Sequence, residues 1–82
     1  MAAEAWRPAW QELPDGSWFT EGPAATEVLL EPEGGGRWRW GVSRHTGTGF
    51  ERYSTGSVGD RGKAAMAAER ACRRAVAEVF RG

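Results

Sequence analysis

The side chains in this sequence best suited to chemistry are arginines, whose planar guanidinium groups bind carboxylates and phosphates. Polar and apolar residues alternate with a period of two over residues 37–44. This spacing predicts a β-strand with Arg37 and Arg39 on one face and Trp38 and Trp40 on the other. We expect the indoles to be buried and the arginine face to meet water or an acidic ligand.

Arg52, on the next expected strand, extends this pair into a cluster across the sheet. Clustered guanidinium groups on an open sheet face are a candidate surface for binding an acidic partner. An equally weighted alternative is that they form ion pairs within the chain, with Glu27 or Glu31 on a neighbouring strand or with the acidic first hairpin. The sequence leaves both interpretations open.

A second basic group is expected along the outer face of a C-terminal helix and consists of Lys63, Arg70, Arg74 and Arg81. This stripe could contact phosphates or a carboxylate-rich protein. The favoured interpretation is an ordinary solvated helix face, because Glu69 and Glu78 dilute its positive field.

Trp6 is a third candidate for partner binding, as an exposed interface anchor. The sequence holds five tryptophans, more than one small core needs once Trp38 and Trp40 are buried. Trp10 and Trp18 are instead expected to fill the core beside a first hairpin.

No combination of residues suggests catalysis, since no Ser/His/Asp, Cys/His or paired-carboxylate pattern is present. His45 has no second histidine or cysteine pair that would make a metal site. The Gly47-Thr48-Gly49 segment precedes a strand rather than a helix, so it lacks the context of a phosphate loop. Cys72 is expected to be a buried structural thiol. We therefore expect a non-enzymatic protein with no cofactor and no metal.

The elements that position these residues are strands followed by one helix. Pro14-Asp15-Gly16 is a tight-turn signal and predicts a first hairpin over residues 9–21, with Trp10 near Trp18. Which face of the last strand, 50–55, is buried is not decided by the sequence, because Phe50 and Tyr53 fall on opposite faces. A bulge near the glycines could place both on the same face. The remaining expected strands are 27–31, 37–44 and 50–55, with turns at 32–36 and 45–49 and a strand break at 56–59.

Asp60 is a good N-cap for a helix over residues 61–81. The fold class is therefore α+β, an antiparallel sheet of three to five strands with one C-terminal α-helix packed on one face. We expect a single domain, 1–82, with a loose leader (1–8), β-hairpins (9–55) and the helix region (60–81). The apolar arc of the helix is expected to comprise Ala65, Ala68, Cys72, Val76, Val79 and Phe80.

Composition limits the class of protein. The 82 residues are 40% hydrophobic and carry no net charge, which suits one small globular domain. The charge is unevenly placed: residues 1–33 hold seven acidic and one basic side chain (−6), and residues 34–82 hold ten basic and four acidic (+6). No signal peptide or membrane span is apparent, and the single cysteine favours a reducing cytoplasm.

The segment 59–71 resembles the start of the last helix of a double-stranded-RNA-binding domain. That resemblance implies a β-sheet followed by an alanine-rich helix, with phosphate contacts at Arg61 and Lys63. The chain as a whole, small and rich in arginine and tryptophan, is similar to the phage proteins that inhibit host defence, anti-CRISPR proteins among them. This second resemblance implies stoichiometric binding to a bacterial nuclease or surveillance complex, within the host cytoplasm if the protein is encoded by a phage.

The sequence therefore supports two possible functions. The first is an inhibitor that occupies the surface of a bacterial host-defence complex of the CRISPR type. The second is a small nucleic-acid-binding module that uses a basic helix or sheet face. Zero net charge favours the first and makes nucleic acid an unfavoured partner. We expect no membrane association, and a monomer or a homodimer.

Overall fold

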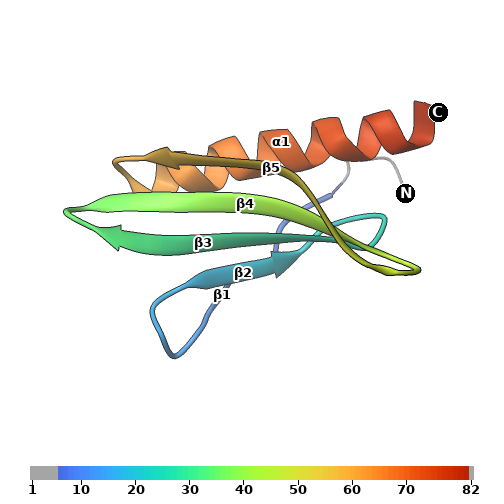
Figure 1. The fold of residues 1–82 in the computed structure, drawn as a ribbon. Coiled ribbons are helices and arrows are strands. Elements are labelled where there is room, and N and C mark those ends of the chain that lie inside the picture. Colours follow the sequence, from blue (N-terminus) through green and yellow to red (C-terminus); the bar gives the residue numbers. More distant parts are fainter. Residues whose placement is uncertain (1–5, 82) are drawn as a thin grey trace.

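The chain folds into one antiparallel sheet covered on one side by one helix (Figure 1). The computed structural model describes the backbone of residues 6–81 and the side chains of residues 6–78. Five strands lie in sequence order across the sheet, which confirms the predicted α+β class. The elements are β1 (Gln11–Glu12), β2 (Trp18–Glu21), β3 (Thr26–Gly34), β4 (Arg37–Thr46), β5 (Gly49–Val58) and α1 (Arg61–Arg81).

The first hairpin forms as its turn sequence predicts, by the pairing of β1 with β2. Asp15 Oδ1 accepts a hydrogen bond from the Ser17 backbone N–H (2.9 Å), and Gly16 has a φ of +89°. Hydrogen bonds from Ser17 hold the pKa of Asp15 below its ordinary value. The turn is thus fixed by the side-chain and backbone preferences of its own residues.

The long strands extend further than the sequence predicts. Residues 32–34 continue β3, and the β3–β4 connection shortens to a tight turn at Gly35 and Gly36, with φ of +61° and +78°. Two successive residues at positive φ suit a two-residue hairpin, and only glycine adopts that geometry without strain. The predicted break at 56–59 is also wrong, because β5 runs to Val58 in register with Trp38.

A bulge in β5 decides which aromatic residue turns inward. Val42 pairs with Ser54 and Ser43 with Arg52, so Tyr53 is an extra residue without a partner in β4. Tyr53 packs against the core, and Phe50 is left 62% exposed on the far side. The bulge lies at Tyr53 itself, several residues from the glycines where it was expected.

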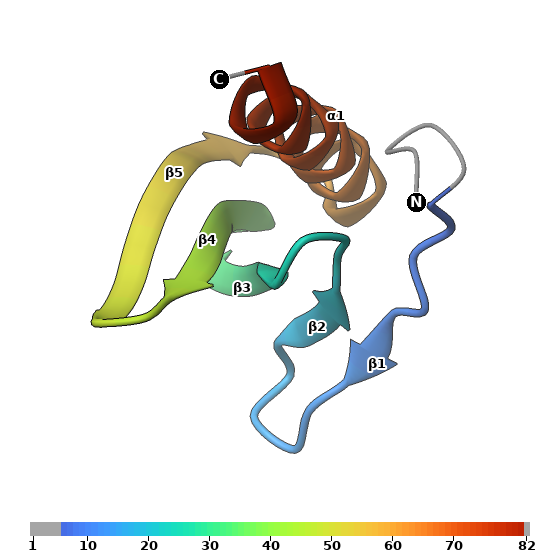
Figure 2. The same ribbon diagram turned by 90° about the vertical axis from the view of Figure 1, so that its right-hand side faces the viewer.

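The helix lies across β3, β4 and β5 (Figure 2), and it packs on them through small side chains. Asp60 caps it as predicted, since Asp60 Oδ1 accepts hydrogen bonds from the N–H groups of Gly62 and Lys63. Small residues let the helix backbone approach the half-buried Trp38 and Trp40. The buried helix residues are Ala64, Ala68, Ala71, Cys72, Ala75 and Val76; Ala65 is half-buried, and the side chains of Val79 and Phe80 lie outside the described residues.

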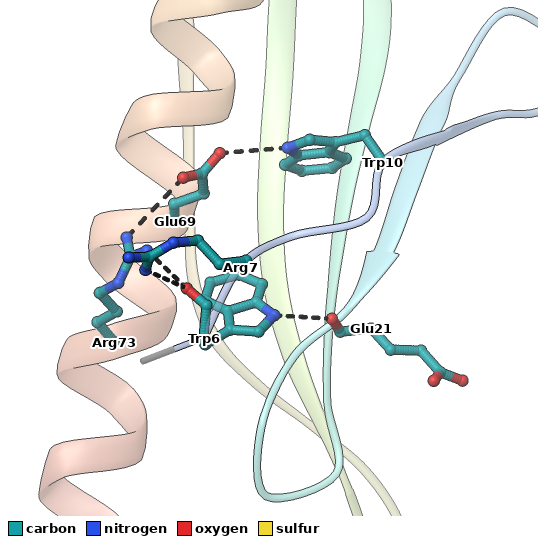
Figure 3. Close-up of polar contacts among 6 residues, drawn as sticks. All are labelled: Trp6, Arg7, Trp10, Glu21, Glu69 and Arg73. Carbon is teal, nitrogen blue, oxygen red and sulfur yellow. Dashed lines mark hydrogen bonds and ion pairs between the residues drawn. The ribbon is translucent and has the colours of Figure 1, made fainter. Parts of the chain in front are cut away.

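The expected loose leader is wrong where the structure describes it, at residues 6–8. The Trp6 side chain is buried at 6% exposure, and its Nε1–H donates to the Glu21 carbonyl oxygen (3.2 Å). The Arg73 guanidinium lies 5.2 Å from the centroid of the Trp6 ring and donates to the Trp6 carbonyl oxygen (Figure 3). A large aromatic ring with a polar N–H gains more from this docked position than from water.

Candidate functional site

The side of the sheet that α1 does not cover, here called the open face, carries a groove of about 440 Å³. Strand alternation places its residues in rows across the sheet. The central row consists of Phe19, Leu29, Gly41 and Thr55; the rows on either side consist of Glu21, Glu27, Ser43 and Arg52, and of Glu31, Arg39 and Ser57. The groove therefore has an apolar floor between two charged rows.

The arginines predicted on this face are there, and two of the three have partners within the chain. Arg39 forms an ion pair with Glu31 (3.7 Å), in which both side chains remain about half exposed (54% and 44%). Arg37 donates to Ser57 Oγ (3.2 Å). The alternative of internal ion pairing is thus confirmed for Arg39, and an exposed pair of this kind contributes only about 0–1 kcal/mol to stability.

Arg52 differs from the other two arginines. Its guanidinium group makes no hydrogen bond or ion pair with the described side chains, and it lies beside Gly41, 3.8 Å from where a Cβ on that glycine would be. Glycine at this position leaves a hollow in the floor of the groove. Arg52 is therefore a cation at the groove wall that is available to a ligand.

Phe50, like Phe19 and Leu29 of the groove floor, is a residue at this site that sequence reasoning missed. Its ring packs against the His45 ring at a tilt of 43°, with centroids 4.2 Å apart, and His45 Nε2 lies 2.6 Å from Glu27 Oε1. The ring borders the groove together with Phe19 and Leu29. Alternation alone does not show which face of the sheet Phe50 points to. Only the register of β5 against β4 would show it, and the bulge shifts that register by one residue.

The helix stripe is on the outer surface as expected. Lys63, Arg70 and Arg74 are exposed, and the Arg81 side chain lies outside the described residues. Met66, on the same side, is 61% exposed. The structure does not bring the stripe together with Arg37, Arg39 and Arg52, because helix and open face lie on opposite sides of the sheet. Arg61, where the RNA-binding resemblance implies phosphate contact, lies over the Trp18 ring (4.5 Å).

Trp6 is not a surface anchor. It contributes to the core cluster, and the segment that carries it is held to α1 at one further point, Trp10 (Figure 3). Trp10 Nε1–H donates to Glu69 Oε2 (3.2 Å), and Glu69 forms an ion pair with Arg73. The prediction failed because α1 packs on β3, β4 and β5 but not on β2, so the helix side of the sheet has room beside β2 for one more indole.

Cys72 is buried, as expected. Its thiol donates to Thr26 Oγ1 (3.4 Å), and burial raises the pKa of the thiol above its ordinary value of 9.0. The Thr26 hydroxyl in turn donates to the Pro23 carbonyl oxygen (2.6 Å). A thiol with a raised pKa inside a packed core is unreactive, so Cys72 belongs to the fold and not to the site.

Within residues 6–81, no three His, Cys, Asp or Glu side chains gather where they could hold a metal ion. The same part of the chain contains no helix that is both long and apolar enough to cross a membrane. Comparison with known proteins gives no match: no protein-family model, no curated protein and no solved structure corresponds to this chain.

Proposed function

We propose that this protein acts without catalysis, by binding a protein partner through the open face of its sheet. The observation that carries the proposal is the groove, in which the exposed Phe50 ring and the available Arg52 flank an apolar floor. Aromatic and arginine side chains around a pocket are the residues that most often dominate binding energy at protein interfaces.

The partner is a protein rather than a nucleic acid. Four glutamates lie on or beside the open face and would repel a phosphate backbone; they are Glu21, Glu27, Glu31 and Glu33. The resemblance to small phage inhibitors adds the class of partner, a bacterial defence complex of the CRISPR type. Occupying the surface of such a complex would block its nuclease or its recruitment.

The test is phage plating on a bacterial strain with an active CRISPR-type nuclease, with and without the expressed protein. We expect plating to recover with the wild type and to fall back with Phe50→Asp or Arg52→Glu. Arg70→Glu, an equally exposed charge reversal on the helix, serves as the matched control and should keep the activity. Failure of the wild type on a panel of such strains would contradict the defence target, and loss only in Arg70→Glu would contradict the open face.

Nucleic-acid binding is tested separately by fluorescence anisotropy with duplex and single-stranded DNA and RNA. We expect at most weak retention, lost at about 0.15 M salt, because each phosphate contact contributes steeply to salt dependence. Sub-micromolar binding at that salt, abolished by reversing Arg70 and Arg74, would favour the nucleic-acid module over the inhibitor.

A further inference from the structure

The open face is divided into an acidic and a basic half. β2 and β3 contribute the glutamates, and β4 and β5 contribute Arg37, Arg39 and Arg52. Part of the charge asymmetry of the sequence thus appears on one surface as an acidic and a basic half, side by side. A surface of this kind can complement itself if a second copy is turned so that the halves exchange.

The strand register shows which symmetry achieves this. Consider a two-fold axis that lies along the strands, above the face and between β3 and β4. It places β3 of one copy over β4 of the other, and β2 over β5. Each row of one copy then faces the same row of the second copy, with the order of the strands reversed.

Three contacts follow from that superposition, one from each row. In the first row Glu21 of one copy faces Arg52 of the second. In the central row Leu29 faces Gly41, so an aliphatic side chain enters the hollow that the glycine leaves. In the third row Glu31 faces Arg39, which extends the existing ion pair into a four-membered network across the axis.

Other pairings of two copies are less favourable. A two-fold axis across the strands superposes the basic halves on each other and the acidic halves on each other, which is repulsive. Edge-to-edge pairing through β5 is interrupted by the bulge at Tyr53, a device that blunts exposed edges. Of these arrangements, only the axis along the strands places acidic residues opposite basic residues and an aliphatic side chain opposite the hollow at Gly41.

We propose that a second copy of this chain packs on the open face, sheet against sheet, in a symmetric homodimer. Two twisted sheets pack in this way with their strands roughly aligned, at about 30° and about 10 Å apart. Arg52 gains a carboxylate partner in the dimer, and Phe19, Leu29 and the groove floor lose contact with water. The dimer regulates the same face that the proposed function uses, so a partner protein has to displace the second copy.

Sedimentation velocity of the purified protein tests the dimer without any partner, so its failure would leave the proposed function standing. We expect a reversible dimer between about 1 µM and about 1 mM protein, the affinity range of modest interfaces. Raising the salt concentration should weaken it, because its rim is ionic. A wild type that sediments as a monomer throughout this range would overturn the proposal.

Exchanging the charges of Arg39 and Glu31 tests whether the open face forms the dimer interface. Arg39→Glu alone should weaken the dimer at least about tenfold, and adding Glu31→Arg should restore it, since the pair is then complementary again within and between copies. Gly41→Val should weaken the dimer by filling the hollow, while far-ultraviolet circular dichroism shows a native fold. Arg70→Glu is the control and should dimerise like the wild type. If Arg39→Glu dimerises normally, or if the double exchange does not recover the dimer, another surface mediates it.

Discussion

The two faces of this sheet are built on opposite principles. Towards α1, the strands present Val28, Leu30 and Val42, which are buried at 0–2% exposure against alanines. On the open face, the same strands present Leu29, Gly41 and charged residues that are only half-buried or exposed. Because strand side chains alternate, one sequence specifies both surfaces at once, and the packed core and the proposed binding face lie on different sides of the same backbone.

Trp6 provides the largest expected effect on the helix side of this comparison. Trp6→Ala removes a buried ring, its hydrogen bond to Glu21 and its contact with Arg73, and should lower the free energy of unfolding by about 3–5 kcal/mol. Urea denaturation measures it. A loss below about 1 kcal/mol would mean that the N-terminal segment is a loose leader after all.

Ala68 tests the close approach of helix and sheet. Ala68 is fully buried, so Ala68→Trp should overpack the contact with β3 and β4 and cost about 1–3 kcal/mol. The control is Ala77→Trp, an identical change at an exposed position of the same helix. Thermal melts in which both variants match the wild type would contradict the docking of this helix face.

The ionisation of Cys72 tests how tightly the helix side of the sheet is packed. Burial raises the pKa of the folded thiol above 9.0, so folding favours the protonated form. This contribution to stability is complete below pH 9.0 and is lost as the pH rises towards the folded pKa, with a slope of at most about 1.4 kcal/mol per pH unit. Cys72→Ala should remove that slope from urea titrations between about pH 8 and pH 10. An equal slope in both proteins, or rapid labelling of the native thiol by Ellman's reagent, would place Cys72 at an accessible position.

Sequence reasoning recovered the parts of this fold that depend on local chemistry. The Pro14-Asp15-Gly16 turn, the Asp60 cap and the alternation of 37–44 act over a few residues, and each forms as predicted. Strand ends and the direction of Phe50 depend on pairing between strands, which periodicity does not contain. The same is true of Ala24 and Ala25, whose positive φ values of 56° and 63° are accompanied by hydrogen bonds from Arg44 and His45 to their carbonyl oxygens.

The candidate site was predicted only in part, because some of its residues are placed by local alternation and others by contacts between distant segments. Arg37, Arg39 and Arg52 share a face because of alternation and one correct strand pairing. The apolar floor escaped notice because Phe19 and Leu29 lie in short apolar runs, in which alternation does not show which side chains face the helix. Trp6 was misplaced because its binding position is built by Arg73 and Glu21, which are distant in the sequence.

Two glycines on neighbouring strands test the division between the faces most directly. A Cβ on Gly41, on the open face, would meet nothing closer than 3.8 Å, whereas a Cβ on Gly56, on the helix side, would lie 2.6–2.7 Å from the Trp40 ring. The measurement is the free energy of unfolding of Gly41→Ala and Gly56→Ala by urea denaturation at one low protein concentration. We expect Gly41→Ala to be more stable than the wild type by about 0.5–1 kcal/mol, as alanine is in a strand, and Gly56→Ala to be less stable by about 1–3 kcal/mol. Equal destabilisation by both substitutions would contradict the account, because the open face would then be as tightly packed as the core.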